Sequence, residues 1–337
     1  MSKNHHRTMA FCTSLLIALP LLGGCSPDIG PVQGESGERT FSGSPTDVRP
    51  VPEELETIPA GYGAPASQQG TLTELAYDTY ESTTYEQKTQ RLAKRAMVYL
   101  PYNYDAKQQY NVFYLMHGGF ADETRVLGTP ESPSSFKNVL DNAVESGQIQ
   151  PLIIVAPTYN STSENDSDNF SLALTLTENF HRELLSDLMP AVEGKYSTYA
   201  AGDTTPSSFR ASRDHRGFGG FSMGSVATWR TFQYDLDYFR YFLPMSCGTT
   251  LDMDSIMESA SDHDPSDYFV WIITGSRDFA QPYDERRVEL MGDSWYFTQS
   301  DDERDGNFAF RVKDGYSHDE QATQEYTYNG LRWFWAS

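Results

Sequence analysis

Cysteine is scarce in this chain, with three residues in 337, and this leaves no basis for a disulfide framework. Cys12 and Cys25 lie in an N-terminal stretch with the pattern of an export signal, so Cys247 has no partner within the chain. We interpret Cys247 as a packing residue near the end of a strand. The fold therefore depends on a hydrophobic core rather than on covalent cross-links.

Basic residues are also few, 25 Lys and Arg against 47 Asp and Glu, and the formal net charge is -22. This charge disfavours nucleic acid and other anionic polymers as partners, and it does not favour docking on an anionic lipid surface. A neutral polysaccharide is compatible with it. Two acidic stretches, 164–168 and 301–303, contain oxygen ligands that suit calcium, but neither has the spacing of an EF-hand loop. Calcium binding stays open, and the chemistry inferred below requires no metal and no cofactor.

Long hydrophobic runs are absent except near the N-terminus. The apolar stretch Met9–Leu22 follows a short basic head, and it is too short and too close to the terminus for a good membrane-spanning helix. Residues 1–24 are therefore predicted to be a signal peptide. Leu22-Gly23-Gly24-Cys25 resembles a bacterial lipobox, in which the cysteine is lipidated and becomes the new N-terminus. We expect an exported protein that is attached to the bacterial cell surface or envelope only through lipid on Cys25, with plain secretion as the alternative.

Large apolar residues are rare between residues 25 and 70, where Pro, Gly, Ser and Glu dominate. Such a composition cannot bury enough surface to offset its ordering entropy, so residues 25–70 are predicted to be a flexible linker. No internal repeat is visible. Residues 71–337 are long enough for one sizeable core and are predicted to form a single catalytic domain.

The remaining sequence alternates between short apolar runs and amphipathic segments. Continuous apolar runs such as 111–116 and 268–274 are typical of strands buried on both faces, whereas 176–196 has apolar residues at helical spacing. This alternation predicts an α/β fold with a mostly parallel central sheet and helices on both faces. The inserts 160–170 and 202–214 are expected to form the rim of the site. Strands are predicted near 72–80, 96–100, 111–116, 152–156, 240–246, 268–274 and 307–312, helices near 134–146, 176–196, 283–292 and 322–335, and a further strand and helix around 220–232.

The most informative stretch is Gly220-Phe221-Ser222-Met223-Gly224. It leads from a Gly-rich strand into a helix-like run, as in a nucleophile elbow, where a serine on a tight turn adopts strained backbone angles. Glycine on both sides removes the Cβ atoms that would collide there. The pattern predicts Ser222 as a nucleophile. The turn would also point the N–H of Met223 at the space next to the Ser222 hydroxyl.

A serine nucleophile needs a histidine base and an acid that orients this base, and with such an elbow the order along the chain is Ser, then Asp or Glu, then His. Of the seven histidines, only His318 lies late enough to follow an acid placed after a further strand. Asp278 comes directly after the run 268–274, at the end of a strand where catalytic groups gather. Asp278 is therefore the predicted acid, with Asp284 as the fallback.

An oxyanion hole is predicted from a second Gly-rich loop. The strand 111–116 ends in His117-Gly118-Gly119-Phe120. One N–H from such a loop and one from the residue after the nucleophile bind the oxyanion of a tetrahedral intermediate. Gly119 is the predicted donor beside Met223, with Phe120 as the next candidate. His117 is expected to shape the loop through hydrogen bonds rather than to act as a base.

The chain carries four segments that match the motifs of one enzyme family: Val98-Tyr99-Leu100-Pro101, Tyr114-Leu115-Met116-His117-Gly118-Gly119, Arg213-Asp214-His215-Arg216-Gly217-Phe218-Gly219-Gly220-Phe221-Ser222-Met223-Gly224 and Thr274-Gly275-Ser276-Arg277-Asp278. They resemble the feruloyl esterase branch of carbohydrate esterase family 1, which also contains acetyl xylan esterases and lies near the esterase D group. The resemblance runs from about Thr71 to the C-terminus. It implies an α/β-hydrolase fold and the roles of nucleophile, acid and base for Ser222, Asp278 and His318. Family members often carry aromatic residues just after the histidine, whereas this chain has Asp319-Glu320-Gln321, which leaves the preferred acyl group open.

The resemblance implies a serine esterase that releases ferulic or related hydroxycinnamic acids from plant cell-wall polysaccharide, such as arabinoxylan, through an acyl-enzyme. Its partners would be polysaccharide esters or feruloylated oligosaccharides. An acetyl xylan esterase or another short-chain esterase would share the same catalytic residues, whereas a serine peptidase is less expected because propeller repeats are absent. A surface glycan-binding lipoprotein is the non-enzymatic alternative. Tyr159, Trp229 and Tyr283 are available as walls of an aromatic acyl pocket, although core or surface packing explains each of them more simply.

Overall fold

The computed structural model describes residues 50–336. The predicted signal peptide, Cys25 and residues 26–49 of the predicted linker lie outside the described residues. Among residues 50–336, no helix combines the length and the apolar character needed to cross a membrane.

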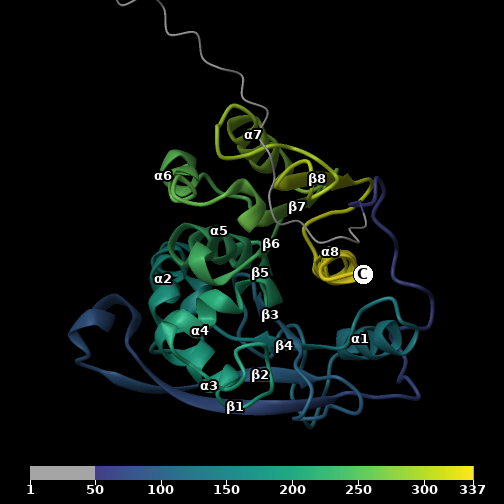
Figure 1. Ribbon diagram of the computed structural model, residues 1–337, viewed down its shortest axis with the longest axis vertical. Coiled ribbons are helices and arrows are strands. Elements are labelled where there is room, and N and C mark those ends of the chain that lie inside the picture. The colour runs from purple at the N-terminus through teal and green to yellow at the C-terminus, as the bar shows by residue number, and fades with distance from the viewer. Residues whose placement is uncertain (1–49, 337) are drawn as a thin grey trace, which may run out of the picture. The chain divides into compact units, whose positions relative to one another are not determined.

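The described chain is built around an eight-stranded sheet with the order β1-β2-β4-β3-β5-β6-β7-β8 (Figure 1). β2 pairs antiparallel with both β1 and β4, and all other neighbouring strands are parallel. The predicted mostly parallel sheet is thus confirmed, with an antiparallel edge at β1 and β2. The bounds are β1 Thr71–Tyr80, β2 Arg91–Leu100, β3 Asn111–Met116, β4 Leu152–Ala156, β5 Arg216–Phe221, β6 Tyr241–Met245, β7 Phe269–Gly275 and β8 Phe308–Lys313.

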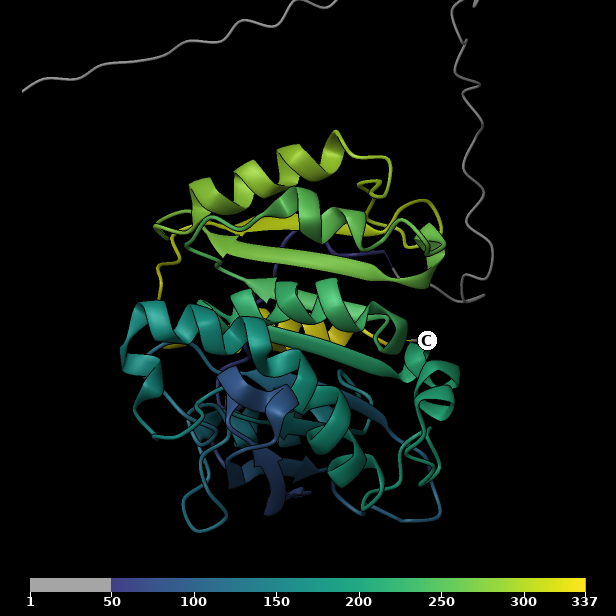
Figure 2. The same ribbon diagram turned by 90° about the vertical axis from the view of Figure 1, so that its left-hand side faces the viewer.

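Helices cover both faces of this sheet, as predicted (Figures 1 and 2). Side chains of α1 and α8 pack on one face, and side chains of α2, α5 and α6 pack on the other. Figure 2 looks onto the second of these layers. The bounds are α1 Ser135–Glu145, α2 Phe170–Glu183, α3 Met189–Glu193, α4 Pro206–Ala211, α5 Met223–Asp235, α6 Met253–Glu258, α7 Gln281–Gly292 and α8 Glu320–Trp333.

The central strands bury side chains on both faces, as their continuous apolar runs predict. In β3, Tyr114 and Met116 join the core beneath α2 and α5, whereas Phe113 and Leu115 join the core beneath α1 and α8. The alternation follows from the period of two residues along a strand. Cys247, just after β6, is fully buried, which agrees with its interpretation as a packing residue.

The predicted linker boundary at residue 70 is wrong. Val51 is only 2% exposed, and Arg311 Nε donates to the carbonyl oxygen of Pro52 at 2.7 Å. Further along, the amide of Asn142 on α1 donates to the carbonyl oxygen of Tyr62 at 3.0 Å. Residues 51–70 thus pack against the domain. Backbone carbonyl groups accept many of the hydrogen bonds, and a few apolar side chains, Val51, Leu55, Ile58 and Tyr62, pack against the core. Four large apolar residues in twenty leave little sign in the composition.

The carboxyl ends of β3, β5 and β7 lie at one edge of the sheet, and the candidate site forms there. The insert 160–170 contributes Ser167 and Phe170 to the pocket at this edge. The insert 202–214 contributes no residue to this pocket. It precedes β5 and lies at the amino end of this strand, where Arg216 donates to the carbonyl oxygen of Phe209 at 2.9 Å. The expectation that 202–214 forms part of the rim is therefore wrong.

Candidate active site

Ser222 occupies a strained turn between β5 and α5. Its φ of 58° and ψ of −115° lie in a region that residues with a side chain rarely adopt. The Ser222 N–H donates to the carbonyl oxygen of Met245 at 2.9 Å, which ties the turn to the end of β6. A Cβ on Gly220 would lie 2.5 Å from the Gly224 carbonyl group, and a Cβ on Gly224 would lie 2.4 Å from the carbonyl oxygen of Met116. Both flanking glycines are thus required by contact, as the sequence predicts.

His318 and Asp278 are joined at the pocket edge, as the sequence predicts. Nδ1 of His318 lies 2.9 and 3.0 Å from the two carboxylate oxygens of Asp278. Since an ionised carboxylate only accepts, Nδ1 carries the proton and Nε2 presents its lone pair. Burial alone would raise the pKa of Asp278, but hydrogen bonds from His318 and from the Ala280 N–H outweigh it and keep this pKa below its usual value.

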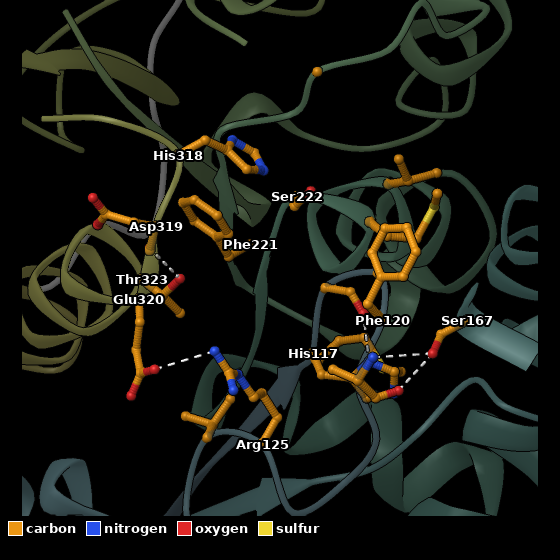
Figure 3. Close-up of a pocket in the computed structure, with 18 of the residues that line it drawn as sticks. His117, Phe120, Arg125, Ser167, Phe221, Ser222, His318, Asp319, Glu320 and Thr323 are labelled. Atoms are coloured by element: carbon orange, nitrogen blue, oxygen red, sulfur yellow. Dashed lines mark hydrogen bonds and ion pairs between the residues drawn. The ribbon is translucent and has the colours of Figure 1, made fainter. Parts of the chain in front are cut away.

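The imidazole of His318 is positioned by two aromatic rings. Its centroid lies 4.5 Å from that of Phe221 and 4.4 Å from that of Phe279. Figure 3 shows a ring nitrogen of His318 turned toward Ser222. Among the described residues no hydrogen bond yet joins these two side chains, which is common before a substrate binds.

Asp284, the fallback acid, has a different environment. It is 1% exposed, pairs with Arg287 at 2.7 Å and accepts the N–H of Cys247 at 3.2 Å. Burial raises the pKa of Asp284 to about 7, although both partners favour the charged form. Arg287 Nη1 also donates to the carbonyl oxygen of Cys247 at 2.8 Å. Asp284 thus fixes the loop after β6 and does not contact His318.

Met223 and Gly119 both line the pocket at Ser222, and the sequence predicts the backbone N–H of each as an oxyanion donor. Met223 begins α5, and the first N–H groups of a helix have no acceptor within that helix. In the second loop, the N–H of Phe120 is already donated to the carbonyl oxygen of Ser167 at 3.2 Å. Within residues 50–336 the N–H of Gly119 has no such acceptor. This distinction favours Gly119 over Phe120 as the second oxyanion donor.

His117 and Tyr159 hold the Gly-rich loop in place through hydrogen bonds to the carbonyl oxygen of Gly118. His117 Nδ1 lies 2.7 Å from the Gly118 carbonyl oxygen, and its Nε2 lies 2.7 Å from the Thr158 hydroxyl. A carbonyl oxygen only accepts, so Nδ1 donates and Nε2 accepts the Thr158 proton. Burial lowers the pKa of His117 to about 4, which keeps the ring neutral. The expected loop-shaping role of His117 agrees with these contacts.

Of the three aromatic residues considered as pocket walls, none lines the pocket at Ser222. Tyr159 stacks on His117 with centroids 4.5 Å apart and donates its hydroxyl to the Gly118 carbonyl oxygen at 2.9 Å. Trp229 is 1% exposed and belongs to the core. Tyr283 lines a second hollow nearby. The aromatic residues that do line the pocket are Phe120, Phe170, Phe221 and Phe279. Three of them lie next to predicted catalytic segments and Phe170 lies in the predicted rim insert, but no spacing marks any of them as an acyl-pocket wall.

The pocket has a volume of about 460 Å³. Its deeper walls are buried and apolar, namely Met116, Val126, Phe221, Met223 and Val226, and the more exposed rings Phe120, Phe170 and Phe279 also line it. Across the pocket Arg125 pairs with Glu320 at 3.1 Å, as Figure 3 shows, and both side chains are more than half exposed. Asp319 caps α8 by accepting the N–H of Ala322 at 3.0 Å. The acidic residues after His318 thus have structural partners.

No group of three or more His, Cys, Asp or Glu side chains within residues 50–336 is arranged to hold a metal ion. In the first acidic stretch, Asp166 Oδ2 accepts the N–H groups of Ser161, Thr162 and Ser163. In the second, Glu303 pairs with Arg240 at 2.9 Å. Asp166 therefore orders its own loop, and Glu303 joins its loop to Arg240 just before β6.

Comparison with known proteins identifies the family. A family model described as putative esterase matches residues 92–328. The chain belongs to the putative esterase family. This esterase is 35% identical over 299 residues to the endo-1,4-beta-xylanase Y of Acetivibrio thermocellus. The match covers 86% of this chain and 25% of that protein, so the chain spans a quarter of the length of that relative.

Solved structures agree with this assignment. The esterase is 33% identical to the feruloyl esterase module from Clostridium thermocellum, which was solved as a mutant complexed with sinapinate. The TM-score is 0.72, and the match covers 86% of this chain and 95% of that one. A ferulic acid esterase from Anaeromyces mucronatus has the same fold, with 18% identity, a TM-score of 0.57 and coverage of 83% and 97%. The α/β-hydrolase fold, the family resemblance and a carboxylic ester hydrolase are thereby confirmed.

Proposed function

We propose that this esterase is a serine carboxylesterase that releases ferulic or related hydroxycinnamic acids from plant cell-wall polysaccharide. The observation that carries the proposal is the hydrogen bond between His318 and Asp278 next to the strained turn of Ser222. The similarity to the feruloyl esterase module supports the acyl class. The similarity to the xylanase supports a xylan-based substrate.

The residues suggest a complete acyl-transfer cycle. Nε2 of His318 takes the Ser222 proton as the hydroxyl oxygen attacks the ester carbonyl, and the oxyanion is bound by the N–H groups of Met223 and Gly119. His318 then gives its proton to the departing sugar oxygen. Water repeats the sequence on the acyl-enzyme and releases the acid. Asp278 stays ionised throughout and holds the tautomer of the imidazole.

The shape of the pocket supports an aromatic acyl group over an acetyl group. Its volume of about 460 Å³ and its buried apolar walls suit a flat ring. An acetyl group would leave most of this space unfilled. Acetyl release is therefore the competing outcome in the test rather than the expected one.

The test compares ferulate release from methyl ferulate with acetate release from acetylated xylan, using the wild type and Ser222→Ala. Serine-dependent ferulate release with little acetate supports the proposal. Serine-dependent acetate release alone would assign the protein to the acetyl esterases. Equal inactivity of the two proteins on both substrates would remove the enzymatic assignment and favour a glycan-binding lipoprotein.

We also propose that the protein is exported and anchored through lipid on Cys25, which lies outside the described residues. The support is the sequence Leu22-Gly23-Gly24-Cys25 after a short apolar stretch. Labelled palmitate should be incorporated into the wild type and into Cys12→Ser, but not into Cys25→Ser. Equal labelling of Cys25→Ser would exclude this anchor, and recovery of unlabelled wild type from the medium would indicate plain secretion.

A further inference from the structure

A second hollow of about 420 Å³ lies beside the pocket at Ser222. It is formed between α6 and α7 and shares Thr249 with that pocket. Next to Thr249, Gly248 and the exposed ring of Phe279 line the pocket at Ser222, and they pack so closely that a Cβ on Gly248 would lie 2.3 Å from the ring. The two spaces therefore meet at Thr249.

The wall shared by the two hollows is rigidly held. The buried side chain of Arg287 donates to the carbonyl oxygens of Cys247 and Thr249, and it pairs with Asp284. Asp284 in turn accepts the N–H of Cys247 at 3.2 Å. The loop that carries Thr249 is thus fixed from α7, so this wall is formed before any ligand arrives.

The chemistry of the second hollow suits a sugar ring. Its floor is apolar, with Leu251, Met253 and Leu290, and the ring of Tyr283 is 41% exposed at its side. Thr249, Thr250, Pro282, Arg286 and Arg287 complete the lining. Arg286 is exposed and also pairs with Glu289 at 2.8 Å, which leaves its other N–H groups for a ligand. A pentose presents C–H groups on its faces and hydroxyl groups around its edge. An aromatic ring with polar groups at the margin complements both parts.

The substrate of an ester hydrolase has two arms that leave the carbonyl carbon, an acyl arm and an alcohol arm. The buried apolar walls next to Ser222, including Met116 and Val226, suit the acyl arm. The alcohol arm then needs a second space that opens from the same carbonyl position. The hollow beyond Thr249 is the candidate for this space, because it shares Thr249 with the pocket at Ser222.

We propose that the hollow between α6 and α7 binds the sugar residues of the alcohol arm, with Tyr283 as the stacking surface and Arg286 as a hydrogen-bond donor. This subsite rests on the proposed esterase function, and it makes the enzyme prefer feruloylated glycan over simple ferulate esters. A sugar that does not react is bound equally in the ground state and in the transition state, so its binding lowers KM and leaves kcat nearly unchanged.

The test measures kcat/KM on methyl ferulate, which has no sugar, and on a feruloylated arabinose–xylose oligosaccharide. Tyr283→Ala should lower kcat/KM on the oligosaccharide about tenfold, mainly through KM, and leave methyl ferulate within about twofold. Tyr283→Phe should keep most of the wild-type value because it keeps the ring. Tyr102→Ala, which removes another exposed tyrosine outside both hollows, should change neither substrate.

The outcomes separate this subsite from the esterase function itself. Methyl ferulate hydrolysis by the wild type tests the esterase alone. Hydrolysis of methyl ferulate with no selective effect of Tyr283→Ala on the oligosaccharide overturns the sugar subsite only. Equal loss on both substrates also overturns it, because Tyr283 would then act through the shared site. A wild type inactive on both substrates overturns the esterase proposal and the subsite together.

Discussion

Tyr159 and His117 donate hydrogen bonds to one and the same acceptor, the carbonyl oxygen of Gly118, at 2.9 and 2.7 Å. This carbonyl group and the N–H of Gly119 belong to a single planar peptide unit, so an orientation imposed on one is imposed on the other. The two stacked side chains therefore aim the proposed oxyanion donor. A donor that is oriented before the reaction costs no reorganisation when charge develops on the carbonyl oxygen.

Tyr159→Phe should lower kcat on methyl ferulate about tenfold and change KM by less than about twofold. The substitution keeps the stacking on His117 and removes one of the two hydrogen bonds that orient the peptide. A loss confined to kcat is expected when an interaction acts only in the transition state. Steady-state kinetics at saturating and limiting ester concentrations measure this division.

Tyr328→Phe is the matched control. It removes a tyrosine hydroxyl that donates to Gln148 at 2.7 Å and does not line the pocket. This variant should lose a similar amount of stability, about 1 kcal/mol, and keep its kcat. If Tyr159→Phe keeps the wild-type kcat as well, the orientation of the Gly118 peptide does not limit catalysis.

The candidate catalytic residues could be predicted from the sequence. The order of Ser, Asp and His along the chain, together with their positions after predicted strands, leaves few candidates for each role. Ser222 was indicated by its flanking glycines, and Asp278 by its place after a buried strand. Tyr159 could not be identified in this way, because its hydroxyl acts on a peptide 41 residues away in the chain. A single tyrosine after a strand has no spacing that distinguishes this role from core packing.

The sheet was predicted more accurately than the segments around it. The runs 111–116 and 152–156 have the bounds of β3 and β4, because strands buried on both faces show as continuous apolar stretches. The helix predicted over 176–196 instead begins at Phe170, where Asn169 caps it by accepting the N–H of Leu172 at 3.1 Å. Residues 51–70 have the composition of a linker because few of them are apolar and many of their contacts are hydrogen bonds to backbone carbonyl groups.

Asp278→Asn and Asp284→Asn should separate catalysis from loop support. Asn at 278 leaves His318 without a carboxylate to hold its tautomer, so kcat should fall on the order of 10⁴-fold with little change in stability. Above the pKa of about 7 of Asp284, Asn at 284 leaves the buried guanidinium of Arg287 without its counter-charge, which should cost about 3–5 kcal/mol of stability at pH 8. Urea unfolding and kcat on methyl ferulate are measured for both variants. A larger loss of kcat in Asp284→Asn than in Asp278→Asn would reverse the assignment of the acid.

Gly224→Ala should prevent stable folding of the elbow. The added Cβ would lie 2.4 Å from the carbonyl oxygen of Met116 and 2.7 Å from that of His117, and both are backbone atoms that cannot move aside separately. We expect a loss of more than about 3 kcal/mol or no soluble protein. Gly292→Ala is the control, since an added Cβ there meets nothing within 4 Å. Wild-type stability for Gly224→Ala would mean that α5 can move away from β3.

Asp235 is a buried carboxyl group near the end of α5. It is 1% exposed, and its Oδ2 has no hydrogen-bond partner among the described residues. Burial raises the pKa of Asp235 well above its ordinary value of 3.8. Between these two pKa values the native state binds a proton that the unfolded state has lost. The free energy of unfolding contributed by this group therefore falls as the pH rises above about 3.8.

Asp235→Asn should remove this dependence, because Asn has nearly the same shape and is neutral at every pH. We expect the variant and the wild type to be equally stable near pH 4, and the variant to become steadily more stable than the wild type as the pH rises toward 8. Urea unfolding at several pH values measures the difference, in which contributions from all other titrating groups cancel. Asp237→Asn, a change at a half-exposed carboxylate paired with Arg210, should show no such growing gap. A variant less stable than the wild type at pH 8 would mean that Asp235 is ionised in the native state and has a favourable partner there.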